Sequence, residues 1–250
     1  MLTGSPPKRG ATTPTPTVRP KPRRRLWLLE FYDSAVGKKA VMAVTGIILL
    51  GYVLAHMLGN LKIYTGAEHL NAYGEWLRTI GEPALPHKAA LWIMRSVLIL
   101  AFVFHIHAAF ALTRLNRRAR PKGYESKRDY WAANYASRTM RWSGVIVGLF
   151  IVFHLLDLTW GTTNPDFVGG QPYQNVVASF ERWPVAIVYI VANLLLGLHI
   201  FHGAWSMFQS LGWNNPRFNP WRRGFAAGFA AIIVLGNVSF PVAVLTGIVD

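Results

Sequence analysis

The stretch PVAIVYIVANLLLGLHIFHGAWSMFQS, residues 184–210, decides the fold class of this chain. It contains no Asp, Glu, Lys or Arg. A helix of about 20 apolar residues spans the roughly 30 Å hydrocarbon core of a bilayer. An open strand cannot do so, because its backbone groups would lack hydrogen-bond partners in lipid. We therefore predict that residues 184–210 form a transmembrane helix.

Four further apolar runs of similar length lie on either side, at residues 40–61, 90–113, 142–160 and 225–248. Only 15% of the 250 residues are charged, against about 25% in soluble domains. The sequence predicts an all-α protein, an integral membrane bundle of five transmembrane helices over residues 31–250, in which no internal repeat is convincing. Residues 1–30, rich in Pro, Thr and Arg, are predicted to be a disordered basic tail.

Lys and Arg are concentrated in three segments: before the first run, between the second and third, and between the fourth and fifth. The other two loops are poor in Lys and Arg and carry acidic residues instead. All three basic segments fall on one side of a five-helix topology, and basic loops favour the cytoplasm. We predict a multi-pass protein of the cell inner (plasma) membrane with a cytoplasmic N-terminus and an outside C-terminus. This topology explains the net charge of +15, so no nucleic-acid partner is predicted.

The first outer loop has an apolar stripe of its own. Leu70, Tyr73, Leu77 and Ile80 recur at spacings of three and four residues, which is the spacing of one helix face. We predict a short amphipathic helix over residues 67–81, lying on the outer membrane interface. The alternative is a loop that merely covers helix ends.

Histidine is the main ligand chemistry that this sequence offers. The absence of Cys excludes disulfides, and it excludes thiolate-bound metals or iron–sulfur clusters built from this chain alone. At ~1.5 Å per residue, His56 and His154 lie ~9 Å below the outer flank of their helices. By the same count His105 and His199 lie ~24–26 Å below it. Four histidines on four helices therefore fall at two depths, two by two.

Two imidazoles that face each other across a bundle are the axial ligands that a six-coordinate haem needs. We predict that His56 and His154 bind one haem iron, and that His105 and His199 bind a second. Glycines close to these histidines, which would leave room for the macrocycle, are Gly51, Gly59, Gly148, Gly197 and Gly203. The alternative for any one histidine is a core residue hydrogen-bonded to a neighbouring helix.

The remaining histidines have weaker claims on a cofactor. His202 follows His199 by three residues, so it could replace that ligand or contact a haem propionate. His107 points away from His105 and is predicted to be structural. His69 and His87 belong to the outer loop or its end and are predicted to be interfacial, although His69 could touch a quinone headgroup.

The segments around these histidines resemble a known family. They are AHMLGN (55–60), FH (104–105), FHLLD (153–157) and LHIFHG (198–203), together with VGKK (36–39) and FQSLG (208–212). In order and spacing they are similar to the membrane anchor of succinate dehydrogenase and fumarate reductase, in its five-helix, single-chain, two-haem form. The resemblance runs from Ser34 to Asp250.

The resemblance implies a subunit that passes electrons from an iron–sulfur subunit, through two b-type haems, to a quinone, with menaquinone expected. A flavoprotein subunit would oxidise succinate. Carried over to this sequence, His105 and His199 bind the haem nearer the soluble subunits, and His56 and His154 bind the distal one. Two other classes remain open: a stand-alone dihaem transmembrane cytochrome, and a proton-coupled transporter whose histidines relay protons.

The quinone site is the least determined part of the prediction. Candidates on the outer side are Tyr64, Tyr73, Trp76, Arg95, Asp157 and Trp160, and candidates on the inner side are Arg141, Trp142 and Ser143. Asp157 follows His154 by three residues on the same helix face, where it could relay protons or orient an imidazole. The alternative is a carboxylate that reaches the outer surface.

The predicted cytoplasmic face combines Arg and Lys with aromatic side chains. Its aromatic residues are Tyr124, Tyr130 and Trp131 in the 114–141 loop, and Trp213 and Trp221 in the 212–223 loop. Charges alone are explained by topology and anionic lipid. Topology needs no aromatics, and Arg with aromatics is typical of protein interfaces. We predict that this face docks an iron–sulfur subunit.

Overall fold

The computed structural model describes residues 26–119 and 131–250, with side chains from residue 139 onward in the second part. Within them lie five long helices: α2 (Ala35–Asn60), α4 (Ala89–Ala119), α5 (Trp131–Leu158), α7 (Trp183–Ser210) and α8 (Asn219–Leu245). All five contain a span that is long and apolar enough to cross a membrane, which in α5 is Thr139–Leu158. The predicted all-α fold with five transmembrane helices is confirmed.

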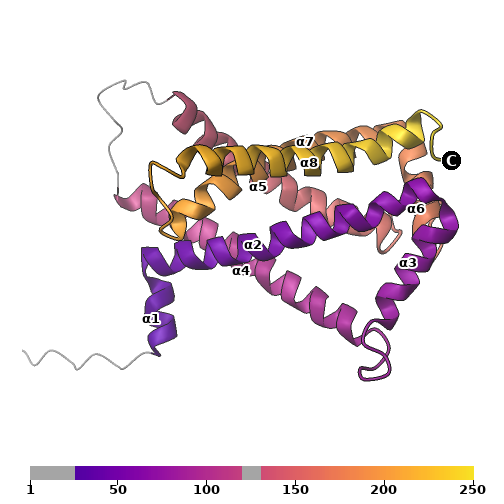
Figure 1. The fold of residues 1–250 in the computed structure, drawn as a ribbon, viewed down its shortest axis with the longest axis horizontal. Helices are drawn as coiled ribbons and strands as arrows, with labels where there is room; N and C mark the ends of the chain where they lie inside the picture. Colours follow the sequence, from indigo (N-terminus) through magenta and orange to yellow (C-terminus); the bar gives the residue numbers. More distant parts are fainter. Residues whose placement is uncertain (1–25, 120–130) are drawn as a thin grey trace, which may run out of the picture.

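Short helices mark the two ends of the bundle (Figure 1). Helix α1 (Trp27–Asp33) lies at the start of α2, whereas η1 (Leu61–Thr65), α3 (Ala67–Thr79) and α6 (Pro172–Glu181) lie at the opposite end with the C-terminus. We refer to these as the α1 end and the α3/α6 end. Residues 27–30, the last part of the predicted disordered tail, are helical, and residues 1–25 lie outside the described residues.

The predicted amphipathic helix exists as α3, which begins after Gly66, a residue with a φ of 99°. Part of its stripe turns toward protein: Leu70 is buried in the core and Tyr73 packs beside it, while Trp76, which stacks on Tyr73, is exposed. Helix α3 thus also covers helix ends, as the alternative interpretation required. Its partner at that end is α6, which the sequence analysis left as loop; Asn71 bonds to the Tyr173 N–H.

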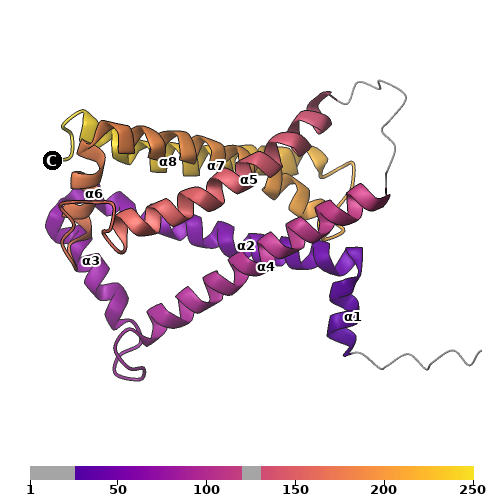
Figure 2. The same ribbon diagram turned by 180° about the vertical axis from the view of Figure 1, so that it is seen from behind.

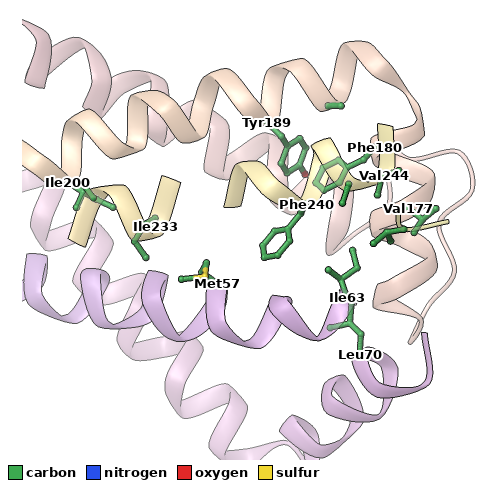
Figure 3. Packing of buried hydrophobic residues seen from close by; sticks show 14 residues of the cluster. Met57, Ile63, Leu70, Val177, Phe180, Tyr189, Ile200, Ile233, Phe240 and Val244 are labelled. Carbon is green, nitrogen blue, oxygen red and sulfur yellow. The ribbon is translucent and has the colours of Figure 1, made fainter. Parts of the chain in front are cut away.

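The long helices pack as α2 on α4, α5 on α7, and α7 on α8, with α2 also meeting α7. Figure 2 shows the bundle from behind, with α4 and α5 running obliquely across it. The buried core lies mainly at the α3/α6 end, where Ile63, Phe180 and Phe240 come together from η1, α6 and α8 (Figure 3). Helix α4, by contrast, exposes Trp92, Ile99, Phe104 and Phe110. Such an apolar outer surface suits contact with lipid.

The tightest helix pair depends on one glycine. A Cβ on Gly197 of α7 would overlap the side chain of Val234 in α8, whereas a Cβ on Gly228 of α8 meets nothing within 4 Å. Small residues of this kind let membrane helices approach closely. Overpacking costs about 1–3 kcal/mol. In a detergent-unfolding titration we therefore expect the midpoint concentration of denaturant to be lower for Gly197→Ala than for Gly228→Ala. Both variants gain the same helix propensity, so equal stability would contradict this account of the packing.

Candidate functional site

Four histidines form two facing pairs inside the bundle. His56 of α2 faces His154 of α5 with ring centroids 5.9 Å apart, and His105 of α4 faces His199 of α7 at 6.5 Å. Thr45 of α2 contacts His105 at 3.2 Å between Oγ1 and Nδ1, and it precedes His56 by eleven residues on the same helix. At ~1.5 Å per residue the two pairs are therefore ~16 Å apart along the bundle. These are the pairs that the depth count predicted.

The spacing within each pair suits one metal ion between the rings. Within the described residues no group of three or more His, Cys, Asp or Glu is placed to hold a metal ion, so each pair offers two ligands. A metal–imidazole bond is about 2.0–2.1 Å and a ring nitrogen lies about 1.1 Å from its centroid, so two trans imidazoles have centroids about 6.3 Å apart. The observed 5.9 and 6.5 Å bracket this value.

At the pair nearer the α1 end, a hydroxyl group lies beside Nδ1 of each histidine. Thr45 donates its only hydroxyl hydrogen to the Val41 carbonyl at 2.7 Å, and Ser143 donates to the Met140 carbonyl at 3.1 Å. With these hydrogens on the carbonyls, each hydroxyl oxygen is an acceptor for Nδ1–H of the histidine beside it: Nδ1 of His105 at 3.2 Å, and Nδ1 of His199 at 3.3 Å. A proton on Nδ1 leaves the lone pair on Nε2, where a metal ligand needs it.

The pair near the α3/α6 end has different partners. Tyr189 donates its hydroxyl hydrogen to Asp157 at 2.9 Å and so accepts from Nδ1 of His154 at 3.4 Å. The amide nitrogen of Asn60, a donor, lies 3.0 Å from Nδ1 of His56. As placed, this contact makes Nδ1 the acceptor, so ligation through Nε2 of His56 requires the amide to turn and present its oxygen to Nδ1. In all four histidines a neighbour contacts Nδ1.

The structure reveals a repeat that the sequence analysis dismissed. Thr45-Gly46 of α2 precedes His56 by the same eleven residues that separate Ser143-Gly144 of α5 from His154. The two glycines lie against the partner rings: a Cβ on Gly46 would be 3.6 Å from His105, and one on Gly144 would be 3.3 Å from His199. Comparing the two histidine helices in register would have found this signal.

The helices that carry facing histidines leave room between them. The pairs α2–α5 and α4–α7 are absent from the closely packed helix pairs of the described chain. Gly51 and Gly148 lie between the two histidine levels, and a Cβ on either would meet no atom within 4 Å. A Cβ on Gly203 would also meet no atom within 4 Å. Gly59 and Gly197 have another role, because Tyr73 and Val234 fill the space beside them. A flat macrocycle between the paired rings is compatible with this arrangement.

The remaining histidines lie outside the pairs. His202 packs against Phe201, and its Nδ1 is buried without a hydrogen-bond partner. His107 stacks on Tyr32 and bonds to its hydroxyl, fastening α1 to α4 in the structural role predicted for it. His87 pairs with Glu82 on the surface. His69 is exposed on α3.

Asp157 is fully buried, so the interpretation that it reaches the outer surface is wrong. Its Oδ1 pairs with Arg182 at 2.8 Å and accepts from Thr163 at 3.4 Å, while its Oδ2 accepts from Ser179 and Tyr189. The carboxylate thereby joins α5 to α6, α7 and the loop between α5 and α6. Sequence reasoning missed these partners, because they are brought together only by α6.

The predicted quinone residues do not form one pocket. Tyr64 bonds to Ser239, Tyr73 stacks on Trp76, and Arg95 lies over the Trp92 ring on α4. Ser143 is buried against His199, whereas Arg141, Trp142 and Trp160 are exposed. A cavity of about 490 Å³ lies elsewhere, at the α7–α8 loop, between aromatic residues and Arg222.

Comparison with known families identifies the architecture. Residues 113–238, half of the chain, match the family model described as succinate dehydrogenase/fumarate reductase transmembrane subunit. The chain belongs to this family. No curated protein and no solved structure matches it.

The part matched to the succinate dehydrogenase/fumarate reductase transmembrane subunits covers α5, α6, α7 and most of α8. His154, His199 and His202 lie inside it, whereas His56 and His105 lie before it. The eleven-residue pattern occurs once before the matched segment, as Thr45–His56, and once within it, as Ser143–His154. His105, outside the match, therefore has the same kinds of neighbour as His199 within it: a hydroxyl beside Nδ1 and a glycine against the ring.

Proposed function

We propose that this chain is the membrane anchor and electron-transfer subunit of a succinate:quinone oxidoreductase, with one b-type haem at each histidine pair. Haem supplies reversible one-electron chemistry at its iron. His56 and His154 would hold one haem, and His105 and His199 the other. The observation that carries the proposal is the imidazole spacing, together with the hydroxyl groups of Thr45, Ser143 and Tyr189 that lie beside Nδ1 of three of the four histidines.

The chain's own residues have three tasks in this function. The four imidazoles would supply the ligand nitrogens, and the neighbours that contact Nδ1 would hold the rings in orientation. The surrounding apolar helices exclude water and keep the dielectric constant low. An iron–sulfur subunit, itself bound to a flavoprotein, would deliver electrons at the α1 end, and quinone, with menaquinone expected, would accept them.

The partner requirement gives the most direct test of this function. A tagged chain purified from its native membrane is expected to bring down a flavoprotein and an iron–sulfur protein, and the complex is expected to reduce quinone with succinate. A haem-containing chain that purifies alone would instead favour a stand-alone cytochrome. A colourless chain without partners would favour the proton-relay transporter and end the proposal.

We further propose that the α1 end faces the cytoplasm in the cell inner (plasma) membrane. Basic residues remain concentrated at that end in the described structure, with Lys38, Arg114 and Arg217 among them. Reporter fusions at Pro7 and Asp250 are expected to lie on opposite sides of the membrane, with Pro7 inside. Both reporters on one side would contradict the five-span topology.

A further inference from the structure

A buried carboxylate is connected to one histidine pair and has no counterpart at the other. We infer that Asp157, acting through Tyr189 as a positioning residue, lowers the redox potential of the haem at the His56–His154 pair, an inference that rests on the proposed function. Two hydrogen bonds carry it, from His154 to Tyr189 and from Tyr189 to Asp157, between described side chains of α5 and α7.

The connection begins at the ring nitrogen turned away from the facing histidine. Nδ1–H of His154 donates to the Tyr189 hydroxyl at 3.4 Å, and that hydroxyl donates to Oδ2 of Asp157 at 2.9 Å. Tyr189 is 4% exposed and Asp157 is 0% exposed. The whole path from imidazole to carboxylate therefore lies in a low-dielectric interior, where hydrogen bonds polarise one another.

Hydrogen-bond donors surround the carboxylate in this interior. Arg182 pairs with Oδ1 at 2.8 Å, Thr163 donates to the same oxygen, and Ser179 donates to Oδ2. A carboxylate acceptor polarises the Tyr189 hydroxyl, which in turn polarises Nδ1–H of His154. Such a partner makes a metal-bound imidazole more basic, and a more basic ligand favours the higher oxidation state of the metal.

The other pair lacks this feature. The paths from His105 and His199 end after one step, at hydroxyls that donate to the Val41 and Met140 carbonyls. Backbone carbonyls are neutral, so they polarise the imidazoles less than a carboxylate does. Among the described residues the two pairs therefore have similar ring geometry but different charge behind the rings.

The Tyr189→Phe variant distinguishes an electrostatic effect of Asp157 on the haem potential from a purely structural role of Asp157 in holding helices together. Phenylalanine keeps the ring, which packs edge-on against Phe180 with centroids 4.8 Å apart. Asp157 loses its bond to the Tyr189 hydroxyl but keeps Arg182, Thr163 and Ser179, so its contacts with α6 and with the residue before α7 survive. The path from the carboxylate to His154 is lost. Tyr52→Phe is the matched control, because Tyr52 lies against His56, with centroids 5.4 Å apart, and its hydroxyl is outside this path.

The experiment is a redox titration of each haem in the purified complex, with the haems assigned by the His56→Ala and His199→Ala variants. In Tyr189→Phe we expect the His56–His154 haem to become easier to reduce, with its ferrous-to-ferric ratio at fixed ambient potential rising about tenfold, equivalent to about 59 mV. The potential of the His105–His199 haem, and both potentials in Tyr52→Phe, should stay unchanged.

Other results overturn the inference in distinguishable ways. If both haems of the Tyr189→Phe complex are present and their redox potentials are unchanged, Asp157 has only a structural role in helix packing. If that variant loses its haem, Asp157→Asn decides: a raised potential at the same haem supports the inference, and an unchanged one overturns it. A complex that contains no haem before any substitution ends the proposed function itself, and this inference with it.

Discussion

Replacing His199 with alanine is expected to remove the haem nearer the α1 end and to leave the other haem in place. His199 faces His105 across the gap between α7 and α4, so its loss would leave that site with one of its two imidazoles. His56→Ala should have the complementary effect at the α3/α6 end. Pyridine haemochrome assay of each purified variant should therefore give about one haem per chain instead of two.

A neighbouring histidine provides the control for these variants. His107 lies two residues from His105 on α4 but bonds to Tyr32 of α1. His107→Ala should keep both haems, although α1 would be less firmly attached. Retention of both haems in a variant lacking His56, His105, His154 and His199 would show that the ligands were assigned wrongly.

Replacing Trp213, Phe218 and Trp221 together with alanine is expected to release the soluble subunits from the membrane chain. These side chains are 66%, 55% and 60% exposed at the α1 end. They line the cavity at the α7–α8 loop, and Arg222 beneath them holds the loop through the Trp213 carbonyl at 3.0 Å. Aromatic anchors in an interface often contribute 2 kcal/mol or more each, so losing three should weaken docking by roughly a thousandfold or more.

The same surface would also suit the interfacial aromatic belt of a membrane protein, and the control distinguishes these roles. Trp160 and Trp183 are 62% and 65% exposed at the α3/α6 end. Their replacement by alanine should leave the soluble subunits bound in a pull-down assay. An intact complex after the triple change would place the docking surface elsewhere. Tyr124 and Tyr130, predicted to belong to it, lie outside the described residues, and Trp131 begins α5.

The sequence predicted the five spans and the two histidine pairs because both depend on one-dimensional regularities. Span length is set by bilayer thickness, and the depth of each histidine follows from a constant rise per residue. His56 and His154 could therefore be matched without knowing how α2 and α5 pack. The short helix α3 was predictable for a similar reason, since its stripe has a period close to 3.6 residues.

The partners of the histidines depend on packing between helices and could not be counted along the chain. Tyr189 reaches His154 from α7, and Arg182 reaches Asp157 from the junction of α6 and α7. A surface carboxylate remained an alternative for Asp157 because this residue lies near the end of its span, but Asp157 is fully buried against α6 and α7. Thr45 and Ser143 were accessible in principle, because their common distance to a histidine is a sequence feature.

The central claim is that two histidine pairs hold two haems, and a reduced-minus-oxidised spectrum of the purified complex, with a haem count per chain, tests it most directly. The account predicts low-spin bis-imidazole haem bands and two haems per chain. An intact complex whose spectrum shows no haem bands would contradict it.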